Sequence, residues 1–227
     1  MNIAERLRAV NERVAVAAER AGRDPSSVRV VAVSKTFGLP EIIAARDAGQ
    51  SVFGENRAQE FASKAAEIRD VEWHFVGHLQ TNKVRQVVGA ASLIHSVDSE
   101  RLAEAIGKRA VGAGIEQAVL VEVNVAGDEQ KHGVTPDDVA DLVARVQALE
   151  GVAVRGLMTI PPLPQGPEDS RPHYKNLASL GAELSATLGP EMELSMGMTR
   201  DFEVAIEEGA TLVRVGEAIF GPRALRS

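Results

Sequence analysis

The chain of 227 residues contains no cysteine. This excludes disulfide bonds, thiolate zinc sites and cysteine nucleophiles together, and it is compatible with a reducing compartment. No segment is strongly basic and the formal net charge is -7, which argues against nucleic acid or an anionic membrane as a partner. No apolar run is long enough to cross a bilayer, and the first residues are too charged for a signal sequence. We therefore expect a cytoplasmic protein.

The chain also lacks the marks of several domains. We find no linker and no domain boundary, and the length is common among single α/β barrels. The hydrophobic share of 44% and the charged share of 25% are those of an ordinary globular protein. No GxGxxG motif follows the first predicted strand, so a dinucleotide-binding open sheet lacks its usual mark. We predict one domain over residues 1–227.

Short apolar runs alternate with amphipathic segments along most of the chain. Residues 2–21 are predicted to form a helix, with Asn2 as its N-cap and Glu5 in the capping-box position. About eight strands follow, each but the last before a helix, which implies a parallel sheet; the count and length favour a (β/α)8 barrel with an extra N-terminal helix. The predicted strands cover residues 28–33, 51–54, 72–76, 92–97, 118–125, 153–159, 192–195 and 211–215, and the helices between them cover 40–48, 57–69, 80–88, 99–111, 137–149, 172–188 and 200–208.

One segment has no periodicity. Residues 160–172 contain five of the ten prolines and follow a predicted barrel strand. A loop in this position can form a lid over a site, but we favour a plain excursion over the surface.

Lys35 follows the densest β-branched run of the chain. Residues 28–33 have the pattern of a strand buried on both faces, and the run stops at Ser34, Lys35 and Thr36. An amine at the carboxyl edge of a core strand is partly desolvated and loses its proton more easily, as a Schiff-base lysine requires. On position alone, the alternative that Lys35 only marks where the strand meets water has equal weight.

If the strands close into a barrel, their carboxyl ends form one rim, where the ligands of such barrels bind. The residues that we expect at this rim are Lys35, Asn56, His74, Gly77, the turn at 96–98, Asn124, Met158, Ser195 and Arg214.

Two segments near the end of the chain suit a phosphate. Residues 194–199 run from a strand through a small glycine-containing turn into a helix, and residues 213–217 follow at the next strand end. Backbone N–H groups and hydroxyls in such turns bind anions, and in barrels phosphates are often held after strands seven and eight. The alternative for the first segment is a simple helix cap. The residues concerned are Ser195, Gly197, Met198, Thr199, Gly216 and Glu217.

A Schiff-base lysine opposite a phosphate site indicates pyridoxal 5′-phosphate (PLP), or else a phosphorylated sugar in a lysine aldolase. Arg214 helps to choose, because a strand arginine beside the phosphate turn could meet the pyridine nitrogen. A cation there keeps that nitrogen unprotonated and makes the ring a poorer electron sink. The alternative for Arg214 is a structural ion pair with Glu217 or Asp201.

Six motifs in this order resemble the pyridoxal phosphate homeostasis protein family, whose fold is that of the N-terminal barrel of alanine racemase. The resemblance implies a Schiff base on Lys35, Arg214 facing the pyridine nitrogen, and Asn56 beside the ring; Ser195, Thr199 and Gly216 would hold the phosphate. The motifs are Val-Ala-Val-Ser-Lys35-Thr, Phe-Gly-Glu55-Asn56, Trp73-His74-Phe-Val-Gly77-His-Leu-Gln80-Thr-Asn82-Lys83, Gly156-Leu-Met158-Thr-Ile-Pro161, Ser195-Met-Gly-Met198-Thr and Val-Arg214-Val-Gly216-Glu-Ala-Ile-Phe-Gly221.

The resemblance further implies a protein that carries PLP in vitamin B6 and amino-acid homeostasis, with PLP-dependent apoenzymes as partners and without established turnover. Alanine racemase takes a tyrosine acid/base from a second domain, and the one tyrosine here is Tyr174. A racemase needs two acid/base groups on opposite faces of its substrate. We expect a binding protein, compatible with a monomer; the rivals are a racemase of low or narrow activity and the aldolase. Arg57 stands where many relatives have an aromatic residue.

Other candidate residues are weaker. His74 and His78 are four residues apart, but Gly77 breaks the strand between them and the other histidines are scattered. We therefore expect no metal site. Lys83 and Lys131 are expected to be solvated loop lysines.

Overall fold

The structure is a computed structural model that describes residues 1–128, 130–188 and 191–222. Its strands are parallel and close into a barrel in sequence order from β1 to β8, which confirms the predicted (β/α)8 fold. The strands are β1 (Arg29–Val33), β2 (Val52–Glu55), β3 (Glu72–Phe75), β4 (Leu93–Val97), β5 (Gln117–Glu122), β6 (Val152–Met158), β7 (Glu193–Ser195) and β8 (Leu212–Val215).

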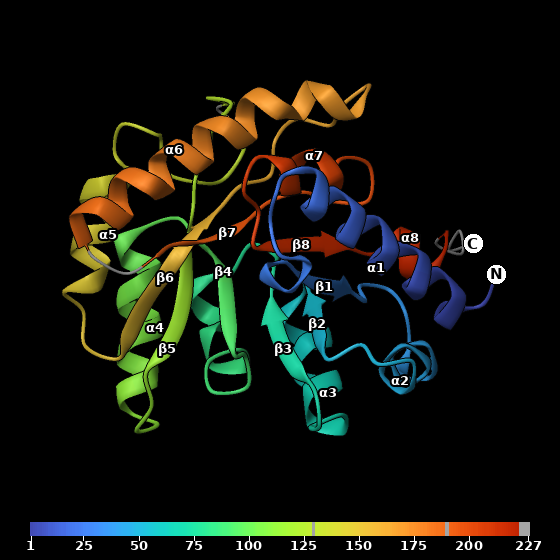
Figure 1. Cartoon of the computed structure of the whole chain (residues 1–227). Helices are drawn as coiled ribbons and strands as arrows, with labels where there is room; N and C mark the ends of the chain where they lie inside the picture. Colours follow the sequence, from blue (N-terminus) through green and yellow to red (C-terminus); the bar gives the residue numbers. More distant parts are fainter. Residues whose placement is uncertain (129, 189–190, 223–227) are drawn as a thin grey trace.

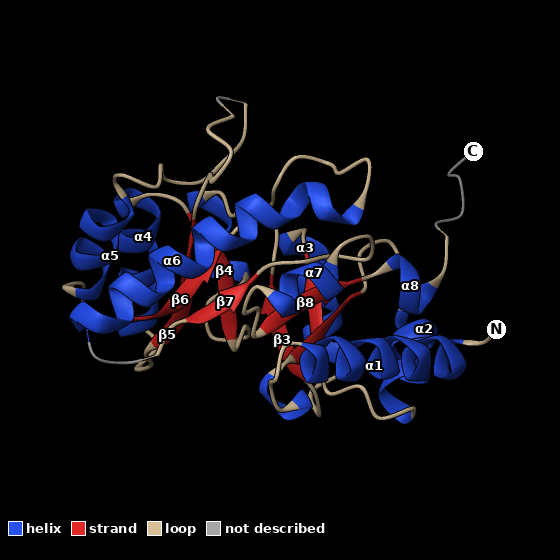
Figure 2. Cartoon of the chain, turned by 45° about the horizontal axis from the view of Figure 1, so that its top comes forward, coloured by secondary structure: helices blue, strands red, loops and turns tan. Residues whose placement is uncertain are grey.

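The helices lie outside the strands, which occupy the centre of the molecule (Figure 1 and Figure 2). The α-helices are α1 (Ile3–Arg20), α2 (Leu39–Asp47), α3 (Ala58–Glu67), α4 (Glu100–Val111), α5 (Val139–Gln147), α6 (Arg171–Leu188), α7 (Phe202–Glu207) and α8 (Glu217–Phe220). Short 3-10 helices are η1 (Pro25–Ser27), η2 (Thr81–Gln86) and η3 (Pro167–Ser170).

Two connections differ from the prediction. The segment after β3, predicted as a helix over 80–88, is the short 3-10 helix η2, which buries Val84, and not an α-helix. The last strand, predicted to have no helix after it, is followed by the four-residue α8, which buries Ile219 and Phe220.

Helix α1 is confirmed with its capping box. The Asn2 side chain accepts the Glu5 N–H, and the Glu5 carboxylate accepts the Asn2 N–H, both at 2.9 Å. The apolar face of α1 packs against α2, α7 and α8, and the Arg6 guanidinium donates to the carbonyls of Ile219 and Phe220. In Figure 1 the dark blue helix lies beside the red end of the chain, so α1 covers the barrel itself.

Apolar side chains fill the inside of the barrel, so the candidate site lies above them at the carboxyl ends of the strands. Side chains alternate along a strand, so Val31 and Val33 of β1 point inward and Lys35 follows them at the carboxyl end. The apolar interior consists of Val31, Val33, Val52, Val76, Leu93, Leu120, Met158 and Leu212, and a larger apolar core fills the space between strands and helices. No helix among the described residues has the length and apolarity that crossing a bilayer requires.

Candidate functional site

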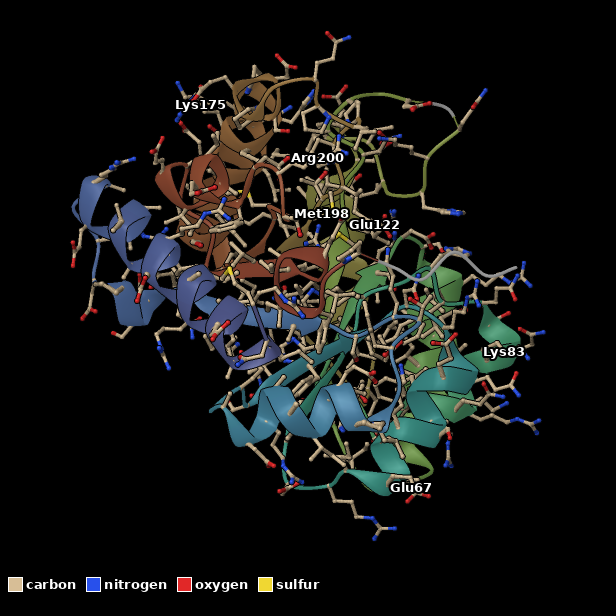
Figure 3. All side chains as sticks on the ribbon, turned by 90° about the vertical axis from the view of Figure 1, so that its right-hand side faces the viewer. Glu67, Lys83, Glu122, Lys175, Met198 and Arg200 are labelled. Atoms are coloured by element: carbon tan, nitrogen blue, oxygen red, sulfur yellow. The ribbon has the colours of Figure 1, made fainter. Side chains whose placement is uncertain are left out.

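A pocket of about 440 Å³ opens at the carboxyl ends of the strands, and we call it the upper pocket. Of the predicted site residues, it is lined by Lys35, Asn56, Met198, Thr199, Arg214, Gly216 and Glu217. Glu122 and Arg200 also line it, and Figure 3 shows both near Met198 on the same part of the molecule, away from Lys83. The sequence-predicted lysine, arginine and phosphate turn therefore meet in one pocket.

Four predicted residues do not line this pocket. His74, Met158 and Ser195 are completely buried in the barrel, below the pocket floor, and Gly197 lies inside its turn. A strand pattern shows that a residue is near a strand end but not its depth: β3 continues beyond His74, so His74 lies one layer below Val76. A direct contact of these residues with a ligand stays a prediction.

The turn that holds Lys35 is fixed from behind by a buried cluster. The Glu55 carboxylate accepts hydrogen bonds from the Ser34 hydroxyl at 2.7 Å and from the Lys64 ammonium at 2.5 Å. Lys64 also donates to the Ser34 carbonyl at 3.0 Å. Burial raises the pKa of Glu55, and the bonds from Lys64 and Ser34 act in the opposite direction. Glu55 belongs to one of the six sequence motifs, but the sequence pattern did not indicate that it supports the Lys35 turn.

The residue after Lys35 has a strained backbone. Thr36 has a φ of 73° and is the one described residue other than glycine with positive φ. A β-branched residue in this region costs on the order of 1–3 kcal/mol, which the surrounding contacts must offset. Together with the cluster around Glu55, this sharp turn directs the half-buried Lys35 into the pocket.

Asn56 is positioned by a close approach between β2 and β3. A Cβ atom added to Gly77 would lie 2.1 Å from the Asn56 carbonyl oxygen, so only glycine fits at this place. Both residues line the pocket. Arg57 is exposed and forms an ion pair with Glu60 at 3.4 Å.

The predicted phosphate turn is pre-formed. Gly197 has a φ of 88°, and a Cβ there would lie 2.5 Å from that of Ala205. The buried carboxylate of Asp201 accepts the Met198 N–H at 2.8 Å and the Ser170 hydroxyl at 2.7 Å. The N–H of Met198 is thus already bonded, which leaves the Thr199 side chain and the rest of the turn to face a ligand.

Arg214 is 4% exposed and has two neutral acceptors. One terminal nitrogen donates to the Ser195 hydroxyl at 2.6 Å, and the other donates to the Thr159 carbonyl at 2.8 Å. The ion pair with Glu217 or Asp201 that the sequence left open does not form. Burial lowers the pKa of Arg214, and the charges of Tyr174, Glu122 and Asp201 oppose this.

Ser195 links Arg214 to a hydrogen-bonded chain along the barrel interior. Ser195 bonds His95 at 2.8 Å, His95 bonds His74 at 2.9 Å, and His74 bonds Glu72 at 2.8 Å. The Glu72 carboxylate only accepts, so Nε2 of His74 donates to it. With one proton on each ring, Nε2 of His95 donates to Nδ1 of His74, and the Ser195 hydroxyl, which accepts from Arg214, donates to Nδ1 of His95. We call these five residues the axial chain.

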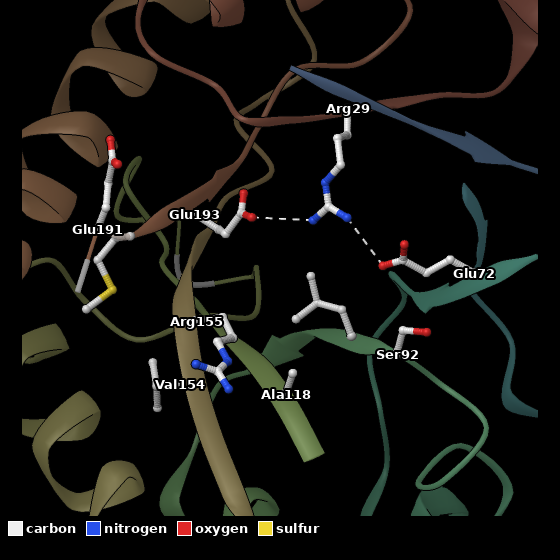
Figure 4. Close-up of a pocket in the computed structure, with 10 residues that line it drawn as sticks. Arg29, Glu72, Ser92, Ala118, Val154, Arg155, Glu191 and Glu193 are labelled. Carbon is white, nitrogen blue, oxygen red and sulfur yellow. Dashed lines mark hydrogen bonds and ion pairs between the residues drawn. The ribbon is translucent and has the colours of Figure 1, made fainter. Parts of the chain in front are cut away.

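The axial chain ends in a second pocket, of about 290 Å³, at the amino ends of the strands. Figure 4 shows Arg29 there between Glu72 and Glu193, at 3.3 Å from each. The hydrogen bond from His74 is the main cause that lowers the pKa of Glu72. Burial is the main cause that lowers the pKa of His95 well below its usual value, and the positive charges of Arg214 and Arg29 act in the same direction, in agreement with a neutral His95 ring.

Glu122 is a site residue that the sequence analysis missed. It is 7% exposed at the end of β5, and burial and then the charge of Asp98 raise its pKa to about 7. The predicted strand 118–125 was too long, so Glu122 was hidden inside it. Val134 instead returns to donate to the Glu122 carbonyl, and the strand ends there.

The proline-rich segment borders the pocket. Ile160, Leu163 and Pro164 line the pocket, and Ile160 and Leu163 are exposed, so the segment runs over the surface as preferred and also borders the pocket. Tyr174, at the start of α6, is completely buried and does not line the pocket. Burial raises the pKa of its hydroxyl.

Comparison with known proteins gives consistent results. The sequence model of the alanine racemase N-terminal domain family matches residues 6–224. A pyridoxal phosphate homeostasis protein of Aquifex aeolicus is 48% identical over 98% of this chain and 99% of its own length. The human protein of the same name is 39% identical over 96% of this chain and 85% of its own length.

A solved structure shows the same fold. PipY of Synechococcus elongatus PCC7942, with PLP bound, superposes with a TM-score of 0.82 at 36% identity, covering 97% of this chain and all of that one.

Proposed function

The chain belongs to the pyridoxal phosphate homeostasis protein family, and from this premise we propose that its upper pocket holds PLP on Lys35. The protein thereby acts in intracellular vitamin B6 and amino-acid homeostasis. The observation that carries the proposal is the meeting of Lys35, Arg214 and the 197–199 turn in one pocket. A relative, PipY, has been solved with PLP bound.

The chain's own groups fit the three polar parts of PLP. The cofactor supplies an aldehyde that a lysine amine can attack. Lys35, on its constrained turn, would provide the amine. The pre-formed turn after β7, with Thr199 and Gly216 beside it, would take the phosphate, and Asn56 would lie beside the ring. Ser195 would contribute to cofactor binding by accepting the hydrogen bond that holds Arg214 in place.

Arg214 suits the pyridine nitrogen because its acceptors are neutral. Its positive charge is not cancelled by a bonded carboxylate, so it can act on the pocket. A cation at this nitrogen disfavours protonation of the ring and weakens the ring as an electron sink. The site then favours holding the cofactor over carbanion chemistry.

The rival function, a racemase of low or narrow activity, needs an acid/base group on the face opposite Lys35. Tyr174 does not supply it, since it is buried and its pKa is raised. The relatives compared above are named as homeostasis proteins. We therefore propose binding and delivery without turnover; assays for racemisation of a panel of amino acids would test this.

The recipients of the cofactor are part of the same proposal. We propose PLP-dependent apoenzymes as partners, a cytoplasmic location and a monomeric state. These rest on the family resemblance and on sequence composition.

Visible absorption spectroscopy tests the proposal. The purified protein, incubated with PLP, should show a Schiff-base band that borohydride abolishes. Lys35→Ala should lack the band. Lys83→Ala is the matched control, because Lys83 is an exposed lysine on η2 outside the pocket, and it should keep the band. A wild type that stays colourless would contradict the proposal and favour the phosphosugar aldolase. A Lys35→Ala variant that keeps the band would contradict the assignment of the Schiff base to Lys35.

A further inference from the structure

Three side chains that could bind a metal meet at the mouth of the upper pocket. His78 follows β3, Asp98 follows β4, and His132 lies in the loop after β5. One ligand atom from each lies within 4.8 Å of the other two. We call these residues the histidine–aspartate cluster. The sequence spacing brought only His74 and His78 into consideration and led us to expect no metal site; His74 belongs to the axial chain in the barrel interior.

The position of His132 is determined by a fold-back of the chain after β5. The Asn124 N–H donates to the Val134 carbonyl at 2.9 Å, and the Val134 N–H donates to the Glu122 carbonyl at 2.8 Å. The Asn124 side-chain amide also donates to the Asp128 carbonyl and accepts the Asp128 N–H. His132 thus stands over the strand ends, where its ring stacks on that of His78 with centroids 3.7 Å apart.

The distances in this cluster suit a shared ion better than direct hydrogen bonds. Oδ2 of Asp98 lies 3.5 Å from Nδ1 of His78 and 3.8 Å from Nδ1 of His132. Both exceed the ordinary N–H···O range of about 2.7–3.2 Å. Two ligands of a tetrahedral ion, with bonds of about 2.0–2.1 Å, stand about 3.3 Å apart. The two rings are stacked with an angle of 12° between their planes, so binding one ion requires the side chains to rotate until both nitrogen lone pairs point at it.

The Asp98 carboxylate is prepared for a cation. Its other oxygen accepts the Ser99 hydroxyl at 3.0 Å, which orients Oδ2 toward the two rings. Its side chain is only 16% exposed, and its negative charge contributes to the raised pKa of Glu122. A partly buried carboxylate gains more from a bound cation than a fully solvated one would.

We propose that His78, Asp98 and His132 bind one divalent transition-metal ion, of the class of Zn²⁺, Co²⁺ or Ni²⁺, at the mouth of the upper pocket. Two imidazole ligands select this class over Mg²⁺ and Ca²⁺, which prefer oxygen. Three protein ligands leave at least one position for water or another donor. The ion ties the loop after β5 to the ends of β3 and β4.

Isothermal titration calorimetry of the full-length protein with Zn²⁺, in a non-chelating buffer, tests the site. Wild type should bind one equivalent. His132→Ala and Asp98→Asn should bind at least about tenfold to hundredfold more weakly, since loss of a ligand costs no less than loss of a supporting residue. The exposed position of His132 makes its substitution compatible with folding.

His173→Ala is the matched control, because His173 lies on α6 outside the cluster. It should bind Zn²⁺ like wild type. The PLP content is measured for every variant, and loss of Zn²⁺ binding in His132→Ala protein that keeps its PLP separates this site from chelation by bound PLP. A Co²⁺ titration should give visible d–d bands that His132→Ala lacks. Equal Zn²⁺ affinity of wild type and His132→Ala, no binding at millimolar Zn²⁺, or displacement of Zn²⁺ by equimolar Mg²⁺ would overturn the proposal.

Discussion

The two ends of the barrel use the same residue types in opposite ways. At the amino end, Arg29 lies between the carboxylates of Glu72 and Glu193, and its side chain is 41% exposed. At the carboxyl end, Arg214 is buried and bonded to a hydroxyl and a carbonyl. The glutamates differ too: the pKa of Glu72 is lowered, and that of Glu122 is raised to about 7.

This contrast separates a supporting end from a binding end. Charges that neutralise one another hold structure and offer little to a ligand. A buried cation with neutral partners, and a carboxyl group able to change its charge near neutral pH, keep their electrostatic effect for whatever enters the pocket. The binding end is therefore recognised by its buried charged groups, Arg214 and Glu122, and the ion pairs of Arg29 belong to the supporting end.

The largest expected effect comes from cutting the link between the ends. His95→Leu puts an apolar side chain of similar size in place of the imidazole, which leaves the Ser195 O–H without its acceptor and Nδ1 of His74 without its donor. Each unsatisfied buried group costs about 1–3 kcal/mol, so the free energy of unfolding should fall by about 2–6 kcal/mol. Urea denaturation measures the change.

His173→Leu is the control for that variant. The residue lies on the outer helix α6, and the change should stay within about 0.5 kcal/mol. A loss below about 1 kcal/mol in His95→Leu would mean that the axial chain does not join the two ends energetically.

Glu122→Gln sharpens the comparison at the carboxyl end. The folded pKa of Glu122 lies above its unfolded value, so its contribution to stability is present below pH 4.5 and is lost as the pH rises through about 7. At about 1.4 kcal/mol for each pH unit, wild type loses up to about 3 kcal/mol from this group. The variant should lack this decline in unfolding experiments between pH 4.5 and 7.5. Parallel curves for the two proteins would refute it.

Glu72→Gln should act in the opposite direction and more weakly. The folded pKa of Glu72 is lowered, so its contribution is present above the unfolded value of 4.5 and is lost as the pH falls through the folded value. Because the side chain is 37% exposed, we expect a loss of about 1 kcal/mol or less at pH 7. The difference from wild type, followed by urea denaturation from pH 7 to pH 3, should vanish on acidification. A difference that grows on acidification would contradict the contrast between the ends.

Much of the fold and the centre of the site could be predicted from the sequence. Lys35 follows the end of a run of β-branched residues and Arg214 lies one residue before the end of the last strand, and in a parallel barrel such strand ends meet on one rim. The turn at Gly197 was recognisable because small residues separate a strand from a helix.

What the sequence missed depends on pairings across the barrel. His95 finds Ser195 one hundred residues away, and no periodicity encodes that contact. Glu122 was hidden by apolar Val123 and Val125, which extend the strand pattern, whereas the returning backbone at Val134 ends the strand. Depth was the other failure, since Met158 and Ser195 lie below the pocket floor and do not line it.

The axial chain has a consequence for how such sequences diverge. Its five members come from β3, β4, β7 and β8, and each inner member both donates and accepts a hydrogen bond. A substitution at one position therefore removes a hydrogen-bond partner from a neighbouring member of the chain, so substitutions at these five positions are not independent. In descent the five residues should be kept or exchanged as a set, with apolar replacements arriving together.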